Sequence, residues 1–236
     1  MSAEFRQRLA RRLGWQRGVH DPALEPRNAL PILPALRRWQ AARLAASFGD
    51  FLADPTRRPA AEFFLADLYG DRDFSARDRD AARVLPMMSR LLPDTLLRAA
   101  TDAIELAVLS HALDLRMAEA LAGRRDPMAL VSDDDYARAY RQVGLPRLRA
   151  HQIALILRVG TALDAAVRKH GVHKLLKAAR IPAQLAGLSE LQAFLERGFT
   201  AFGALGGAED FLNDLGERER LLSHRLFTGQ NAPFQP

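Results

Sequence analysis

The segment "DAIELAVLSHALDLRMAEAL", from Asp102 to Leu121, is the most informative part of the sequence about the fold. At about 100° per residue, its apolar side chains form two stripes on opposite sides of one helix. One stripe contains Leu106, Leu109, Leu113 and Met117, and the other contains Ile104, Val108 and Leu115. A helix that is apolar on two sides lies between other helices, so this stretch predicts the central helix of a bundle.

Helical periodicity continues along the rest of the chain. No segment alternates apolar and polar residues between turn residues as a strand does, and no unit of about 20–50 residues repeats. The expected helices cover residues 35–52, 59–69, 76–92, 94–121, 133–143, 147–169, 172–180, 189–202 and 208–227. The chain is therefore predicted to be all-α, a single bundle of about eight or nine helices preceded by a basic N-terminal helical arm.

Several helix ends carry recognisable signals. Ser132 precedes three aspartates and Gly144 follows the next apolar pattern, which predicts a capped helix between them. Ser189 with Gln192 three residues later resembles an N-terminal capping pair. Pro182 is expected to end the helix that precedes it.

The chain divides into a basic start and a neutral remainder. We expect an arm with the first helices at residues 1–57, including an extended proline-rich connector at 21–34, a helical domain at 58–230 and a flexible tail at 231–236. Residues 1–60 contain eleven Arg and five acidic residues, whereas the remainder contains 23 basic and 23 acidic residues. The arm could pack on its own domain, dock on an acidic partner or a second copy of the chain, or touch nucleic acid or an anionic membrane.

Composition excludes several classes of protein. The absence of cysteine removes disulfides, thiol nucleophiles, iron–sulfur clusters and cysteine-based zinc sites. The most apolar run, "IALILRVGTAL" at 153–163, is short and contains Arg158, so no transmembrane segment is predicted. Because no signal peptide is evident at the N-terminus, we expect a cytoplasmic protein. No cofactor is predicted.

The segment "FFLADLYGDRDFSARD" at 63–78 contains a conspicuous run of acidic and basic residues. Gly70 is placed to end one helix in the left-handed conformation, and Ser75 is placed to cap the next. Asp71 and Asp73 are therefore predicted to be turn residues between two helices rather than catalytic groups. Pro86 predicts a kink in the helix that follows.

A resemblance to a known family rests on three segments. They are "AEFFLADLYGDRDFSARDRD" at 61–80, "ELAVLSHALD" at 105–114 and "PAQLAGLSELQAFLERGFTAFGALGGAEDFL" at 182–212. In that order they resemble a family of bacterial proteins described only as a domain of unknown function. The likeness extends over residues 58–234 and implies an all-helical domain, with no established activity, cofactor or catalytic residue.

His111 and Asp114 on the central helix form the first candidate site, a buried polar pair. One interpretation is an acid–base pair with a shifted histidine pKa, and the other is a core histidine satisfied by a neighbouring group. The chain contains neither paired Glu-x-x-His motifs nor His-Glu-x-x-His, so no catalytic residue and no metal site is assigned.

The second candidate is a basic segment, because no acidic residue lies between Asp164 and Glu190. Five of its side chains are candidates for binding an anion: Arg168, Lys169, His173, Lys174 and Lys177. The alternative is a solvated face. His170 and His173 lack a third metal ligand.

These observations favour a non-catalytic helical protein that acts through a protein partner or through self-association. The first alternative is a small-molecule site in the bundle, binding or enzymatic, that combines His111 and Asp114 with the basic segment at 168–180. The second alternative is nucleic-acid binding through the N-terminal arm. The zero net charge of the remaining chain makes this alternative less favourable.

Overall fold

The prediction of an all-α fold is confirmed. The computed structural model describes residues 11–12, 14–16, 18–68, 94–124, 130–169 and 171–235, and this part of the chain contains helices and no strand. Its elements are the short turns and helices η1 (Pro26–Ala29), α3 (Gly49–Ala53), α4 (Arg58–Phe63) and η2 (Phe64–Leu68), and the longer helices α2 (Ile32–Ser47), α6 (Asp94–Ala122), α7 (Asp133–Val143), α8 (Pro146–Val167), α9 (Val172–Leu185), α10 (Ser189–Ala204) and α11 (Glu209–Thr228).

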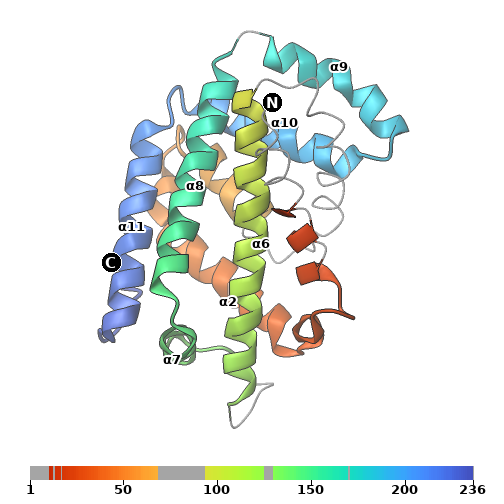
Figure 1. Ribbon diagram of the computed structural model, residues 1–236. Helices are drawn as coiled ribbons and strands as arrows, with labels where there is room; N and C mark the ends of the chain where they lie inside the picture. The colour runs from red at the N-terminus through yellow and green to blue at the C-terminus, as the bar shows by residue number, and fades with distance from the viewer. Residues whose placement is uncertain are drawn as a thin grey trace.

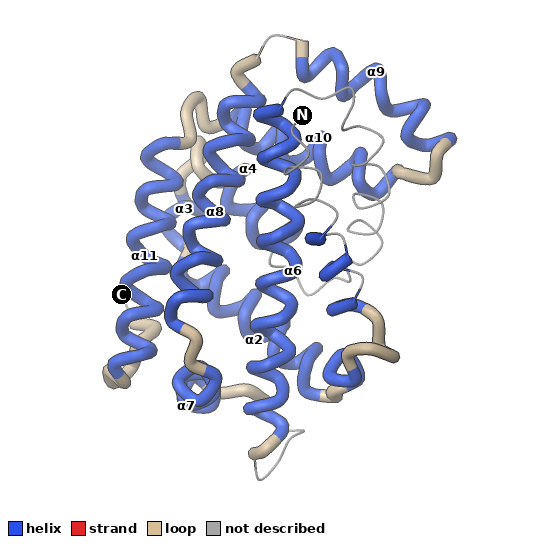
Figure 2. The backbone as a smooth tube through the Cα atoms, viewed as in Figure 1, coloured by secondary structure: helices blue, strands red, loops and turns tan. Residues whose placement is uncertain are grey.

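Helices α6, α8 and α11 lie side by side and form one layer of the bundle (Figure 1). The layer is antiparallel, since α8 returns along α6 and α11 returns along α8 (Figure 1). Helix α2 packs against α6, and α10 packs against α4 and α8. Helix α9 crosses one end of the molecule and rests mainly on α10 (Figure 2).

The central helix is buried on two sides, as the sequence predicts. Val108 and Leu115 belong to a core cluster that α6 shares with α2 and α7. Leu109 and Leu113 point the other way and pack against Leu155 of α8. Each fully buried aliphatic side chain contributes about 1.5–3 kcal/mol, so these two faces fix α6 as the axis of the bundle.

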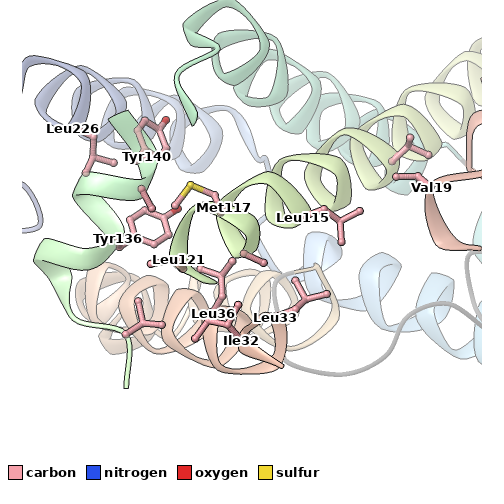
Figure 3. Close-up of a cluster of buried hydrophobic side chains, with 14 of the residues drawn as sticks. Val19, Ile32, Leu33, Leu36, Leu115, Met117, Leu121, Tyr136, Tyr140 and Leu226 are labelled. Carbon is pink, nitrogen blue, oxygen red and sulfur yellow. The ribbon is translucent and has the colours of Figure 1, made fainter. Parts of the chain in front are cut away.

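Helix α7 closes the end of this core with aromatic rings. Figure 3 shows Tyr136 and Tyr140 of α7 beside Met117 of α6, and Leu36 of α2 belongs to the same core cluster. The start of α7 is capped as predicted. The hydroxyl of Ser132 accepts from the backbone N–H of Asp135 at 3.1 Å, and the carboxylate of Asp135 accepts in return. Gly144 ends the helix with a φ of 66°.

The proline-rich segment is not extended, contrary to the prediction. Pro26 is the first residue of η1, and Pro31 directly precedes α2, which begins at Ile32. Proline suits these positions because a helix start does not need its backbone N–H. The expected helix at 35–52 is also divided, since α2 ends before Phe48 and α3 begins at Gly49.

Two other predicted helix signals are wrong. Helix α9 continues through Pro182, because α9 lies at the surface and water can hydrate the carbonyl of Ala178 that proline leaves without a donor. Ser189 is the first residue of α10 and makes no capping bond. Gln192 instead donates to the carbonyl of Leu176 at 2.7 Å and so joins α10 to α9.

The C-terminal segment, predicted to be a flexible tail, packs against the bundle. Pro233 is buried, and the ring of Phe234 lies 5.3 Å from Trp39 and 6.0 Å from Tyr136. Arg225 also donates to the carbonyl of Gln235 at 2.5 Å. Aromatic contacts therefore hold residues 231–235 on α2 and α7.

The acidic stretch at 63–78 is described only as far as Leu68. Helix α4 has Pro59 in its first turn, as predicted, and passes into the wider turn η2. The predictions for Gly70, Asp71, Asp73 and Ser75, for the helix at 76–92 with its kink at Pro86, and for the first ten residues of the helical arm lie outside the described residues.

Helix α8 is long and apolar enough to cross a membrane when judged by length and composition alone. Within this structure it packs between α6 and α11, with Ile153, Leu155 and Ile156 buried. Core helices of soluble proteins have the same length and composition, so this test is weak evidence for a membrane span.

Candidate functional site

His111 lies where α6 meets η1 and α2, and both of its ring nitrogens are bonded. Nη2 of Arg37 lies 2.8 Å from Nδ1, and Oδ1 of Asn28 lies 2.8 Å from Nε2. Arginine can only donate, so Nδ1 accepts and Nε2–H donates. The Asn28 amide is oriented by its own donation to the carbonyls of Val19 and Glu25. These contacts require the neutral Nε2–H form of His111.

The surroundings of His111 keep it uncharged. Burial, together with the nearby His20 and Arg37, lowers the pKa of His111 from 6.5 to about 3. The ring of His20 stacks on His111 with centroids 4.2 Å apart and planes 8° apart. A neutral ring with both nitrogens occupied cannot exchange a proton readily at neutral pH, so the geometry favours a structural role over acid–base chemistry.

Asp114 lies on the same helix but does not bond His111. Its Oδ1 accepts from Nε2 of Gln40 at 3.0 Å, and its Oδ2 lies 4.0 Å from Nε of Arg37. Burial raises the pKa of Asp114, while Gln40 and Arg37 oppose that rise. The carboxyl lies deep between helices, yet 20% of its side-chain surface remains accessible to water.

A third polar group reaches this region from α8. Arg149 is only 6% exposed, and its guanidinium carbon lies 4.6 Å from the centre of the Tyr140 ring. Its Nη1 donates to Gln152 at 3.3 Å, and Gln152 donates to the hydroxyl of Ser110 on α6 at 2.8 Å. Polar side chains therefore connect α6, α7 and α8 through the interior.

We call this region the polar centre, which comprises Arg37, Gln40, Asp114, Tyr140, Arg149 and Gln152. Its edge is formed by α11, where Ser223 bonds the hydroxyl of Tyr140 at 3.0 Å and Glu219 lies 3.5 Å from Nη1 of Arg43. Burial raises the pKa of Tyr140, so the phenol stays protonated. The polar centre holds no recognisable nucleophile activated by a base.

The basic segment predicted to bind an anion lies elsewhere. Arg168 pairs with Asp164 at 2.5 Å, and His173 packs its ring 5.9 Å from that of Phe199. The side chains of three lysines (Lys169, Lys174 and Lys177) are exposed. Helix α9 packs on α10 and α8, whereas His111 is bonded to η1 and α2, so the structure does not bring the two candidate sites together.

The outer face of α9 exposes large apolar side chains. Leu175, Ile181 and Leu185 are 60%, 67% and 86% exposed, and they fall on one stripe of the helix together with Ala178 and Pro182. No residue of α9 is buried. The side of α9 that faces α10 carries only half-buried residues, which are Val172, Leu176, Ala179 and Ala183.

The described end of the N-terminal arm packs on α6. Arg12 forms an ion pair with Glu105, and His151 of α8 bonds the other oxygen of the same carboxylate at 2.9 Å. Val19 is buried in the cluster that contains Leu115. Part of the basic charge near the N-terminus is therefore neutralised within the chain.

A comparison with known protein families gives one match. The family described as "Domain of unknown function (DUF8198)" matches residues 20–233. The chain belongs to this family. No curated protein and no solved structure matches it.

The DUF8198 match includes every residue of the polar centre and all of α9. It begins at His20, so the stacked pair His20–His111 lies within the family region and Arg12 lies before it. Within the described ranges, no group of three or more His, Asp or Glu side chains could hold a metal ion.

Sequence reasoning missed Arg149 in this DUF8198 chain. A usable signal exists, because Arg149 lies four residues before Ile153 and seven before Ile156, on the buried stripe of α8. An arginine at such a position is unusual, since charged side chains are rarely buried without a partner. Because the chain contains 31 arginines, a single arginine on an apolar stripe did not stand out in the sequence.

Proposed function

We propose that this DUF8198 protein is a non-catalytic interaction module, and that α9 binds an acidic amphipathic segment of a protein partner. The observation that carries this proposal is the exposed stripe of Leu175, Ile181 and Leu185. Three large aliphatic side chains on one helix form a contiguous apolar surface, which is typical of an interaction site.

Burial of this stripe would supply most of the binding free energy. Each of the three side chains contributes about 1.5–3 kcal/mol when it is fully removed from water. The stripe extends about 15 Å along α9, since Leu175 and Leu185 are ten residues apart. That length suits a partner helix with anchors at i, i+3 or i+4, and i+7.

Charge indicates which partner would bind. Lys174 and Lys177 are exposed beside the stripe and make no ion pair within the described chain. No acidic residue lies between Asp164 and Glu190. Acidic side chains flanking an apolar partner surface would therefore meet complementary charge, which increases specificity and the rate of association.

A protein partner is favoured over a lipid surface by the composition of α9. Helices that lie in a membrane interface usually carry Trp or Phe on the apolar face and a dense row of basic residues on the other. Helix α9 has no Trp, Tyr or Phe, and Arg180 is already paired with Glu196 at 2.7 Å. The lysines next to the stripe are few and localised.

The direct test uses a defined probe. A fluorescent peptide of about 18 residues, with Leu at i, i+4, i+7 and i+11 and Glu between them, is titrated with the full chain and followed by anisotropy. We expect a Kd of about 10–100 µM, weakened at least about tenfold by Leu175→Ser with Ile181→Ser and by Lys174→Glu with Lys177→Glu. Leu221→Ser, which removes an exposed leucine from α11, is the matched control and should leave binding unchanged.

Three results would count against the proposal. Equal peptide affinity in the α9 variants would show that the stripe is not the binding surface. Flotation with vesicles containing about 30% phosphatidylserine, without peptide binding, would assign α9 to a membrane surface instead. A doubled mass by light scattering that the α9 substitutions abolish, again without peptide binding, would assign it to a second copy of the chain.

A further inference from the structure

Arg149 has an unusual set of contacts for a buried arginine. Its Nη1 bonds Gln152 and its plane rests on Tyr140, but its Nε and Nη2 are buried and have no hydrogen-bond partner among the residues that the structure describes. A buried donor without an acceptor is unfavourable, and the cost is larger for a charged group. The fold therefore keeps Arg149 at this place against a free-energy penalty.

The unpartnered edge of Arg149 is the one that other arginines of this chain use to bind carboxylates. Arg197 places Nε and Nη2 at 3.0 and 2.6 Å from Oδ1 of Asp67. Arg180 places the same two nitrogens at 3.0 and 2.7 Å from the two oxygens of Glu196. This edge matches two oxygens of a carboxylate or phosphate group, so in Arg149 an oxyanion-binding surface is left open in the interior.

The charges around Arg149 also favour an anion. The polar centre contains two guanidinium groups, those of Arg37 and Arg149, and one carboxylate, that of Asp114, whose pKa burial raises and both arginines act to lower. Asp114 is bonded to Gln40 rather than to either guanidinium, and the nearest approach of Arg37 is 4.0 Å. The region has an excess of positive charge, which an entering anion would neutralise.

We propose that the polar centre binds the oxyanion group of a small ligand, a carboxylate or a phosphate, through Nε and Nη2 of Arg149. This site is independent of the surface of α9. Asp114 lies near enough to influence the bound group, and Tyr140 supplies the stacked support that fixes the plane of the guanidinium.

Access to Arg149 leads between α6 and α8. Gln152 and Ser110 are both half-exposed and bond each other, and Gln152 also bonds Arg149, so we infer that the route from solvent to Arg149 passes Gln152. The bond from Arg149 to Gln152 is long at 3.3 Å, so it opposes rotation of the Gln152 side chain only weakly. Rotation of Gln152 about its side-chain torsions would uncover the guanidinium edge without moving a helix.

The test uses the full chain and three salts at matched ionic strength, which are sodium phosphate, sodium succinate and sodium chloride. Calorimetry and thermal unfolding report binding, and we expect phosphate or succinate, but not chloride, to bind below about 10 mM and to raise Tm. Arg149→Lys keeps the charge and removes the two-nitrogen edge, so it should weaken binding at least about tenfold. Arg158→Lys, on the exposed side of the same helix and paired with Asp102 at 3.0 Å, is the matched control.

The result selects the ligand chemistry and can refute the site. A preference for phosphate or for succinate identifies the class of oxyanion. Equal binding by wild type and Arg149→Lys would overturn the proposal, as would stabilisation by chloride equal to that by the other two salts. Gln152→Ala provides a second variant that leaves the guanidinium intact, and it should bind the preferred anion as tightly as wild type or more tightly. Loss of binding in Gln152→Ala would refute the access route.

Discussion

His111 predicts a specific loss of stability in acid. Its pKa is about 3 in the folded protein and 6.5 without burial, so below pH 6.5 the unfolded chain binds a proton that the folded chain does not. Stability from this residue is complete above pH 6.5 and falls by about 1.4 kcal/mol for each pH unit below it. At pH 4.5 the loss amounts to about 2.7 kcal/mol.

The substitution His111→Asn isolates this contribution. Asparagine keeps an acceptor that can face Arg37 but does not titrate. Asp114 acts in the opposite direction, because its raised pKa favours the folded state as pH falls, but it is present in both proteins and cancels in their difference. The free energy of unfolding is measured for both by urea denaturation and circular dichroism between pH 7.5 and 4.5.

We expect the wild type to be more stable than His111→Asn at pH 7.5, with a difference that shrinks steadily below pH 6.5. The cause is protonation of His111 in the unfolded chain, because the folded ring, whose Nδ1 accepts from Arg37, stays neutral over this pH range. A difference that stays constant with pH would refute the argument, because it would mean that His111 titrates in the folded protein as it does in the unfolded chain.

Three further predictions, on helix packing, on the polar centre and on the cap of α7, are tested by urea denaturation. Gly198→Ala would place a Cβ 2.8 Å from the ring of Phe63, and we expect it to lower the free energy of unfolding by about 1–2 kcal/mol. The control is Gly203→Ala on the same helix, where the new Cβ meets no atom closer than 3.7 Å. This control should leave stability unchanged or raise it by up to about 1 kcal/mol. Arg149→Met should raise the free energy of unfolding by about 1–2 kcal/mol, since it removes buried donors without partners; a decrease would indicate a structural role for the charge. Ser132→Ala removes the cap of α7 and should lower stability by about 1 kcal/mol, and no change would contradict the bonded geometry.

The sequence predicted those features that depend on neighbouring residues along the chain. The two stripes of α6 follow from helical periodicity, and the cap at Ser132 follows from a local hydrogen bond. Pro182 was misjudged because the cost of a proline depends on whether water can reach the carbonyl it leaves free, which only the position of α9 reveals.

The candidate site could be predicted only in part. Periodicity placed His111 toward the interior, but its partners Arg37 and Asn28 are 74 and 83 residues away in the chain. Which helix faces which is set by side-chain packing over the whole bundle rather than by any local pattern. For the same reason, the alternative hypothesis of one site that combines His111 with the basic segment at 168–180 could not be judged from the sequence. In the structure His111 is bonded to η1 and α2, whereas α9 packs on α10 and α8.

The two proposed binding sites lie at different places along α8. Arg149 is near the start of α8, and α9 follows its end at Val167, about 27 Å away along the helix axis. Gly160 allows α8 to pack closely on α11, since a Cβ there would lie 2.5 Å from Cδ2 of Leu212. Such close packing holds α8 in one position. Because neither proposed ligand has a contact that would shift α8, occupation of one site should leave affinity at the other unchanged.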